Sequence, residues 1–300
     1  MLSRRAHVVG MIVVVGLGLL GAARAAPAAS VASRIIIVAA ENFYGDIVGQ
    51  IGGDHVAVTS IITDPNVDPH EYVINARDGA AVANARLVIQ NGIGYDDFMN
   101  QLMAASPNPQ RKVIVVAELT GHKKGDNLHL WYDPPTIPKV AQAVLEALVQ
   151  IDPGNATSFR NWYRAFQASL LPLNQAIANT KAQYGGTPIA FTEPVFGYMA
   201  AALGLNVLTP IEFQKAIEEG EDPPASALAR MEDQLKTHQV KVLLYNTQTV
   251  SPITTRVREL ARRVGVPVVG VSETEPPGKS FQQWMLSQLE ALRAALAASK

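Results

Sequence analysis

Four side chains that could bind a metal ion follow predicted strands or lie where a loop meets a helix: His70, His129, Glu193 and Glu273. Imidazole nitrogens and carboxylate oxygens are common ligands of divalent transition metals. In parallel α/β sheets, ligands bind at the carboxyl ends of the strands, so side chains that follow different strands can meet there. Two of the four residues come from each half of the chain, which is what an ion bound between two lobes requires.

His70 lies in a loop whose backbone has little freedom. Residues 64–72 contain two prolines and two aspartates, which restrict the backbone and favour turns. Such a loop can hold one imidazole in place at the end of the preceding predicted strand. Taken alone, the residue favours the simpler interpretation as an exposed turn histidine, and only partners elsewhere in the chain can reverse that preference.

Each of the other three candidates also has a simpler interpretation. His129 could be a core histidine or the start of a helix, and Glu193, which precedes Pro194, could cap a helix. Glu273 could lie in an exposed loop, and Glu275 competes with it as the fourth ligand. The chain has no cysteine, so a metal site here must use histidine and carboxylate ligands rather than thiolates.

Length and charge narrow the function classes. The 300 residues suit one large domain or two medium ones, with a core that needs no disulfides. The chain has 25 Lys and Arg against 26 Asp and Glu, a net charge of −1. Because no basic stripe is present either, no nucleic-acid partner is expected.

The first residues have the pattern of a secretory signal peptide. Arg4 and Arg5 precede an apolar run over residues 8–23, and Ala-Arg-Ala at residues 23–25 provides a cleavage site after Ala25. The run is short for a membrane span and lacks a basic flank after it, although a permanent N-terminal anchor is the alternative. We therefore expect a periplasmic protein, and the lack of cysteine predicts that it carries no lipid anchor.

From residue 34 onward, strand-like and helix-like segments alternate. The strand-like segments are nearly continuous apolar runs bounded by helices, which predicts parallel sheets covered on both faces. Strands are predicted at residues 34–40, 56–62, 87–90, 112–117, 188–192, 207–208, 241–245 and 266–271. Helices are predicted at residues 42–51, 75–85, 95–105, 134–149, 195–203, 225–238, 252–264 and 281–298. Asp133 is expected to cap the fourth of these helices.

A long helical segment separates the two alternating regions. Residues 152–184 carry apolar side chains at helical spacing and end at two glycines. Pro172 lies inside this segment and should kink the helix or split it in two. The segment would be roughly 45 Å long, enough to span two lobes. Further on, the acidic run with two prolines at residues 218–224 is predicted to be a solvated loop that feeds a helix N-terminus.

The predicted fold is α/β, with two lobes that are each a mostly parallel sheet flanked by helices. One long connecting helix joins them, and the ligand cleft lies between the lobes. The predicted boundaries are a signal peptide at residues 1–25, an N-terminal lobe at residues 26–150, the connecting helix at residues 151–186 and a C-terminal lobe at residues 187–300.

Four motifs, taken in order, resemble those of a known family. They are Asp-Pro-His-Glu-Tyr at residues 68–72, Asn-Gly-x-Gly at residues 91–94, His-x-Trp-x-Asp-Pro at residues 129–134 and Thr-Glu-x-x-Phe-Gly-Tyr at residues 192–198. Together they resemble the metal-binding solute receptors of ABC importers, which are manganese- and zinc-specific periplasmic proteins with a rigid helical backbone between two lobes. The resemblance covers residues 36–292. It implies that His70, His129, Glu193 and Glu273 are metal ligands in a protein that is not an enzyme.

The chain departs from this family pattern at several points. Leu128 stands where the family often has proline, and Glu273 stands where it usually has the shorter aspartate. Only residues 122–126 occupy the position of the histidine-rich insert found in many zinc importers, so His122 is expected to be a loop residue. The cysteine that carries a lipid in many members is absent.

The resemblance implies that the protein captures a divalent transition-metal ion and delivers it to a membrane permease driven by a cytoplasmic ATPase. Two neutral imidazoles and two carboxylates would balance the charge of such an ion. A carboxylate rather than a third histidine at position 193 is a harder ligand that favours Mn²⁺ or Fe²⁺, whereas intrinsic affinity favours Zn²⁺. We expect Mn²⁺, with Zn²⁺ close behind and Fe²⁺ as a third candidate, bound to a monomer.

Two other functions are compatible with a metal-binding chain. A secreted metal-dependent hydrolase would need an open coordination position, and the sequence has neither His-Glu-x-x-His nor Gly-x-Ser-x-Gly. A receptor for a metal chelate such as haem or cobalamin would need a wide aromatic cleft, and aromatic residues make up only 6% of the chain. The sequence also lacks a complete Gly-x-x-x-x-Gly-Lys-Ser/Thr motif, so the ATPase must be a separate chain.

Overall fold

The computed structural model describes residues 34–66 and 69–299 together with Leu2, His7 and Gly10. Apart from these last three residues, the predicted signal peptide at residues 1–25 lies outside the described residues. Contacts divide the chain into Met1–Ala32 and Ser33–Lys300, and all described helices and strands belong to the second unit. None of the described helices is both long and apolar enough to cross a membrane.

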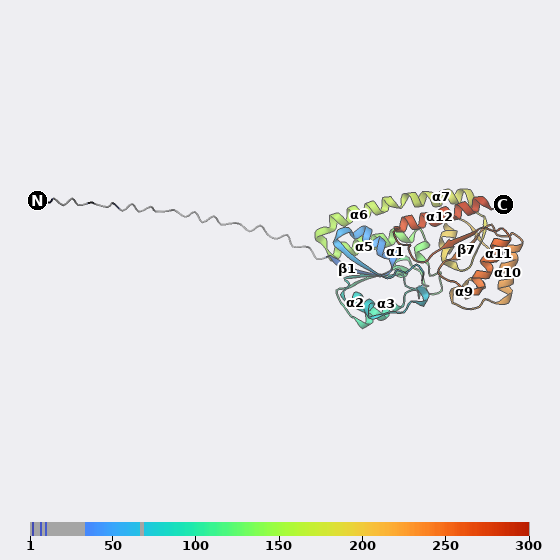
Figure 1. The fold of residues 1–300 in the computed structure, drawn as a ribbon, viewed down its shortest axis with the longest axis horizontal. Coiled ribbons are helices and arrows are strands. Elements are labelled where there is room, and N and C mark those ends of the chain that lie inside the picture. The colour runs from blue at the N-terminus through green and yellow to red at the C-terminus, as the bar shows by residue number, and fades with distance from the viewer. Residues whose placement is uncertain (1, 3–6, 8–9, 11–33, 67–68, 300) are drawn as a thin grey trace. The chain divides into compact units, whose positions relative to one another are not determined.

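The N-terminal lobe contains a four-stranded parallel sheet with the order β2-β1-β3-β4. Its strands are β1 (Ile35–Glu41), β2 (Val56–Ile62), β3 (Leu87–Gln90) and β4 (Lys112–Val115). Its helices are α1 (Asn42–Gly52), α2 (Ala76–Asn84), α3 (Phe98–Ala105), α4 (Val116–Thr120) and α5 (Thr136–Ile151). Successive residues of β1 point to opposite faces of the sheet and belong to different apolar clusters, Ile37 to one and Val38 to another. Both faces of this sheet are therefore covered, with α1 and α5 above it and α2 and α3 below it in Figure 1.

The C-terminal lobe repeats this plan with a parallel sheet in the order β6-β5-β7-β8. Its strands are β5 (Pro188–Phe191), β6 (Asn206–Val207), β7 (Leu243–Asn246) and β8 (Val268–Val271). Its helices are α8 (Gly197–Ala202), α9 (Ile211–Glu218), α10 (Ala225–Lys236), α11 (Pro252–Arg263) and α12 (Phe281–Ala298). Leu243 packs with α9, α10 and α11 in one apolar cluster, whereas Leu244 belongs to the cluster that contains α12. The predicted fold class, two parallel sheets that are each flanked by helices, is confirmed.

Two consecutive helices connect the lobes. They are α6 (Ala156–Ser169) and α7 (Leu171–Tyr184), separated at Leu170. Pro172 lies in the first turn of α7, where a missing backbone N–H breaks no helical hydrogen bond. The proline therefore splits the predicted long helix in two. α6 packs on α1 and α5, and α7 packs on α12, so the pair runs along both lobes (Figure 1).

One apolar cluster extends through both lobes. Trp131 and Tyr132 contribute to it from the N-terminal lobe, and Phe196 and Trp284 from the C-terminal lobe. The ring centroid of Tyr132 lies 5.3 Å from that of Phe196 and 5.9 Å from that of Trp284. The Tyr132 hydroxyl also donates a hydrogen bond to the backbone oxygen of Ser272 at 2.7 Å. A large apolar contact of this kind resists relative movement of the lobes.

Two local predictions are wrong. Asp133 does not cap a helix from residue 134: α5 begins at Thr136, and the Asp133 carboxylate accepts a hydrogen bond from the Thr136 hydroxyl at 2.8 Å. The acidic run does not begin in a loop, because Glu218 is the last residue of α9. Phe213 and Ile217 are buried one helical turn apart and extend the helix to this point. Residues 219–224 form the expected loop before α10, and all of them except Pro223 are exposed.

Candidate metal centre

Three of the four predicted ligands lie together between the lobes. The Nε2 atom of His70 is 3.5 Å from Oε2 of Glu273, and the Nε2 atom of His129 is 3.4 Å from the same oxygen. The ligand atoms of the three residues all lie within 4.8 Å of one another. This distance fits a single small ion between two imidazoles and one carboxylate.

His70 is held by a single turn of 3₁₀ helix, Pro69–Glu71, that follows β2. The turn is closed by the backbone N–H of Tyr72, which donates to the carbonyl of Pro69 at 3.2 Å. The Tyr72 hydroxyl donates to the Asp78 carboxylate at 2.8 Å, which ties this turn to α2. The side chain of His70 is 21% exposed. It is therefore the part of the group that solvent reaches.

His129 is fully buried immediately before a short 3₁₀ helix, Leu130–Tyr132. Its ring centroid lies 5.2 Å from that of Trp131 and 6.1 Å from that of Tyr95. The imidazole is therefore shielded from water among aromatic side chains. His129 is therefore both buried in the core and placed at the start of a short helix, as its simpler interpretation expected, and its Nε2 atom in addition lies 3.4 Å from Glu273.

Glu273 follows β8 and is fully buried. The hydroxyl of Tyr95 donates to its Oε2 atom at 2.9 Å, and the side-chain amide of Asn246 donates to its Oε1 atom. Its backbone N–H donates to Oε1 of Gln248 at 2.7 Å. The carboxylate is thus oriented from both lobes, since Tyr95 belongs to the N-terminal lobe and Asn246 to the C-terminal lobe.

The surroundings of Glu273 keep it ionised. Burial raises the pKa of this carboxyl, but its interactions with the imidazoles of His129 and His70 and the hydrogen bond from Tyr95 outweigh burial and lower that pKa to about 2. Burial and the charge of Glu273 in turn raise the pKa of Tyr95 well above its usual value. Tyr95 therefore remains a hydrogen-bond donor to an anionic carboxylate.

The other two acidic candidates lie outside this group. Glu193 follows β5 and is buried, but its carboxylate is not among the ligand atoms that lie within 4.8 Å of one another. Glu275, which competed with Glu273, is not among them either. Burial and the charge of Asp46 raise the pKa of Glu275 to about 8. Of the two acidic residues after β8, Glu273 is therefore the one that faces the histidines.

Glu218 is a residue near the site that sequence reasoning missed. Its Oε1 atom lies 3.7 Å from Nδ1 of His129, and its side chain is 15% exposed. Burial raises the pKa of Glu218, although its interactions with His129 and His70 oppose this shift. Phe213 and Ile217, four residues apart in the sequence, are the apolar pair that could have predicted a helix ending here. No signal in the sequence pointed from this helix to His129.

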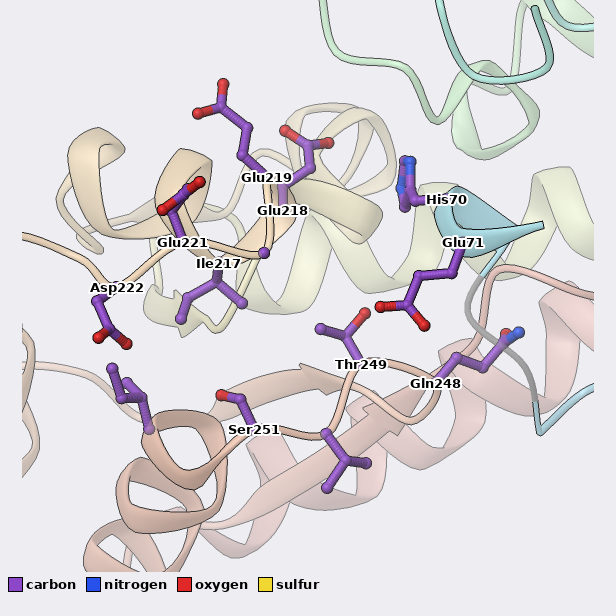
Figure 2. A pocket seen from close by; sticks show the side chains of 13 residues that line it. His70, Glu71, Ile217, Glu218, Glu219, Glu221, Asp222, Gln248, Thr249 and Ser251 are labelled. Carbon is purple, nitrogen blue, oxygen red and sulfur yellow. The ribbon is translucent and has the colours of Figure 1, made fainter. Parts of the chain in front are cut away.

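A cavity of about 380 Å³ opens beside His70. Figure 2 shows Glu218, Glu219, Glu221 and Asp222 of the C-terminal lobe on one side of the cavity and His70 and Glu71 of the N-terminal lobe on the other. None of the described residues that line it is a lysine or an arginine. A mouth lined in this way attracts cations and repels anions. The acidic lining residues are Glu71, Glu218, Glu219, Glu221 and Asp222.

Several known proteins are similar to this chain over most of its length. The high-affinity zinc uptake system protein ZnuA of Bacillus subtilis is 22% identical over 260 residues, which cover 79% of this chain and 80% of that protein. The manganese-binding lipoprotein MntA of Halalkalibacterium halodurans is 23% identical over 247 residues, covering 81% of this chain and 80% of that protein. The solved structure of the periplasmic zinc-binding protein TroA of Treponema pallidum shares the fold, with a TM-score of 0.74 at 20% identity, and the match covers 88% of this chain and 99% of that one.

A family model matches most of the chain as well. The sequence profile described as ZnuA, zinc-uptake complex component A periplasmic, matches residues 37–295. This range contains both sheets except the first two residues of β1, the connecting helices and all four predicted ligands. The chain therefore belongs to the ZnuA family, whose members are periplasmic substrate-binding components of metal ABC transporters and not enzymes.

Proposed function

We propose that this protein captures one divalent transition-metal ion as transported cargo, with His70, His129, Glu193 and Glu273 as the ligands. The observation that carries this proposal is the convergence of two imidazole Nε2 atoms on one oxygen of Glu273, at 3.4 and 3.5 Å. Two neutral imidazoles with two carboxylates would neutralise a divalent ion in a buried site.

The state of His129 supports a bound cation in particular. Its Nε2 atom is buried and has no hydrogen-bond partner among the described residues. Buried polar atoms normally have a partner, and an exception calls for an explanation such as an absent ion. A cation between this nitrogen and the carboxylate of Glu273 would satisfy both groups.

Glu193 enters the proposed ligand set for two reasons. It occupies the ligand position of the Thr-Glu-x-x-Phe-Gly-Tyr motif, and it is buried at the carboxyl end of β5, on the opposite lobe from the two histidines. An arriving ion would draw its carboxylate toward the other three side chains. In that case the ion itself would complete the site, with ligands from both lobes.

We propose Mn²⁺ as the preferred cargo, with Zn²⁺ close behind. Two carboxylates make the ligand set harder than one with three histidines, which suits Mn²⁺ or Fe²⁺. Zn²⁺ has the higher intrinsic affinity for nitrogen and oxygen ligands, so selection of Mn²⁺ would depend on site geometry and on metal supply. The relatives do not decide the question, since one is named for zinc and another for manganese.

Delivery is proposed to proceed through a membrane permease with a cytoplasmic ATPase, as for other members of the family. The helices α6 and α7 and the shared apolar core favour a small movement of the lobes rather than a wide hinge. We further propose that the protein acts as a periplasmic monomer without a lipid anchor after residues 1–25 have been removed. N-terminal sequencing of the exported protein and light scattering test this last part.

Calorimetry of metal-stripped protein tests the site. Mn²⁺, Zn²⁺ and anaerobic Fe²⁺ are titrated into the wild type, His70→Ala, His129→Ala and the control His122→Ala, which removes a histidine outside the ligand group. Each ligand variant should bind at least about 100-fold more weakly, because losing a ligand should exceed the effect of losing an outer-shell partner. The control should match the wild type. Unchanged affinity in both ligand variants would refute the assignment.

Two further measurements test cargo and coordination. The metal content of protein purified from its native compartment should show manganese above zinc, and the reverse would overturn the proposed preference. X-ray absorption of the loaded protein should show four or more protein ligands and no exchangeable water. An exchangeable water on the ion would contradict a closed transport site.

A further inference from the structure

Asn127 makes hydrogen bonds to groups on both lobes. It lies two residues before His129 in the N-terminal lobe and contacts the backbone of the segment that follows Glu193 in the C-terminal lobe. We infer that Asn127 is a positioning residue that sets the tautomer of His129 and couples this histidine to the Glu193 segment. The inference rests on the proposed metal site, because it concerns how two of its ligands are oriented.

The orientation of the Asn127 amide follows from its partners. Its Oδ1 atom accepts a hydrogen bond from the backbone N–H of His129 at 3.0 Å. Its Nδ2 atom donates to the backbone oxygen of Pro194 at 2.7 Å. A backbone N–H can only donate and a carbonyl can only accept, so the amide oxygen and nitrogen cannot be exchanged.

This orientation determines the position of a proton on His129. Nδ1 of the ring lies 2.7 Å from the same Oδ1 atom of Asn127, which can only accept. Nδ1 must therefore carry a hydrogen. In the neutral ring, the lone pair is then on Nε2, the nitrogen that lies 3.4 Å from Glu273. Asn127 thus directs the metal-binding nitrogen of a buried ring toward the proposed site.

Glu218 is the other group near this edge of His129. Its Oε1 atom is 3.7 Å from Nδ1, which is beyond hydrogen-bond distance, whereas Oδ1 of Asn127 is at 2.7 Å. Asn127 is therefore the acceptor in the wild type. Glu218 could take over that role if the amide were removed, so a test that replaces Asn127 must also be carried out without this carboxylate.

The segment after Glu193 is fitted closely around Asn127. A Cβ atom at Gly197 would lie 2.7 Å from Nδ2 of Asn127, closer than side chains tolerate. The hydroxyl of Tyr198 donates to the backbone oxygen of Asn127 at 3.0 Å. Together with the bond to Pro194, these contacts link residues 194–198 to the residue that orients His129. One amide group therefore joins a histidine from one lobe to the carboxylate-bearing segment of the other.

Two substitutions at Asn127 separate its two roles. Asn127→Asp keeps an acceptor for Nδ1 of His129 but removes the donor to the Pro194 carbonyl. Asn127→Leu, of similar size, removes both the acceptor and the donor. It is made alone and, as the double variant, together with Glu218→Gln. Asn161→Leu, on the exposed surface of α6, is the control. The tautomer of His129 is read in the metal-free proteins by long-range proton–nitrogen correlation NMR, and affinity for Mn²⁺ and Zn²⁺ by calorimetry.

The wild type, the control and Asn127→Asp should show the Nδ1–H tautomer. The double variant should gain the Nε2–H tautomer and bind metal about 10- to 100-fold more weakly, the range for outer-shell partners of metal-bound histidines. Asn127→Asp should lose less affinity than the double variant, because it keeps the tautomer. A merely structural role would weaken binding without any change of tautomer.

Failure of this inference differs from failure of the proposed function. A wild type that binds neither ion would refute the metal site itself. A wild type that binds metal but shows the Nε2–H tautomer, or a double variant that keeps both tautomer and affinity, would refute the role of Asn127. If the Leu variants do not fold, Gly197→Ala decides, because its methyl group displaces the amide without removing it. Weaker metal binding would then support the inference, and unchanged binding would overturn it.

Discussion

Glu41 and Glu273 are two fully buried acidic side chains, one in each lobe, and each lies at the carboxyl end of a parallel strand. Their acid–base properties are opposite. The pKa of Glu273 is lowered to about 2, whereas that of Glu41 is raised well above its usual value. Burial raises both, so the difference must come from the neighbours.

The neighbours of Glu41 are acidic. After burial itself, the charge of Asp96 is the main cause of its raised pKa. Asp96 accepts hydrogen bonds from the backbone N–H groups of Asn91 and Gly92 at 2.6 and 2.8 Å, which favours its anionic form. Burial also raises the pKa of Asp96, but these hydrogen bonds oppose that rise, so Glu41 is the one of the two expected to stay protonated. A buried carboxyl next to an anion becomes a neutral structural group, whereas one that faces histidines and hydrogen-bond donors stays charged and can take a cation.

The largest effect is expected when the charge of Glu273 is removed. Glu273→Gln keeps the size of the side chain but cannot supply an anionic oxygen, so affinity for Mn²⁺ and Zn²⁺ should fall at least about 100-fold. Glu275→Gln, two residues away and outside the ligand group, is the matched control and should change affinity far less. Calorimetry on metal-free protein measures both. If the two variants lose the same amount, Glu273 has no special role.

The same substitution at Glu41, the buried carboxyl that is expected to be neutral, tests the other half of the comparison. Glu41 keeps its proton when folded but loses it above a pH of about 4.3 when unfolded. The free energy of unfolding should therefore fall as pH rises, by up to about 1.4 kcal/mol per pH unit, until Glu41 ionises in the folded state. Glu41→Gln cannot ionise and should lack this decline. It should therefore gain stability relative to the wild type between pH 5 and pH 8.

Urea unfolding of metal-free protein at several pH values measures this difference. Glu118→Gln, on the exposed surface of α4, is the control and should follow the wild type at every pH. A wild type and a Glu41→Gln variant with parallel pH profiles would show that Glu41 is ionised when folded. The contrast between the two buried carboxyls would then disappear.

The site differs from the fold in how far sequence reasoning could reach. Continuous apolar strands such as β3 predict parallel sheets, because both faces of such strands must be buried. The carboxyl ends of parallel strands in two facing sheets then bring His70 and Glu273 to one place, and the structure has them 3.5 Å apart. His129 joins them from the loop before α5. Their role as ligands stays a prediction.

What could not be predicted depends on contacts between distant segments. Glu218 is 89 residues from His129 in sequence, counted as 218 minus 129, and it reaches the site only because α9 ends there. The side-chain direction of Glu193 depends on its rotamer, which the end of a strand does not determine. The role of Asn127 depends on the carbonyl of Pro194 in the other lobe. Strand and helix patterns carry no information about such pairs.

Glu193, the second proposed carboxylate ligand on the C-terminal lobe, tests how strongly the type of ligand determines which metal ion is preferred. Glu193→His replaces the proposed oxygen ligand with a nitrogen ligand, so the ratio of Zn²⁺ to Mn²⁺ affinity should rise by about tenfold, or about 1.4 kcal/mol. Competition titration with both ions measures this ratio. Glu232→His, at an acidic residue on α10 that pairs with Arg256 and Lys236, is the control. An unchanged ratio would remove Glu193 from the ligand set.

The smallest effect is expected at Glu218, which combines features of both buried carboxyls. It lies near His129 as Glu273 does, yet burial raises its pKa as it does for Glu41. At 3.7 Å from Nδ1 it can add negative potential behind the ring but no direct ligand. Glu218→Gln should therefore weaken metal binding only a few-fold, less than the outer-shell effect expected for Asn127.

The salt dependence of binding distinguishes Glu218 from the acidic mouth. Glu221→Gln removes a charge from the exposed rim of the same cavity and should slow metal association mainly at low ionic strength, since exposed charges are screened by salt. The effect of Glu218→Gln should persist at high salt, because its carboxylate is largely buried next to His129. Stopped-flow association rates and equilibrium affinities, each measured at low and high salt, separate the two. If both variants lose their effect in high salt, Glu218 acts only as part of the rim. Its proximity to His129 then contributes nothing to the affinity for metal.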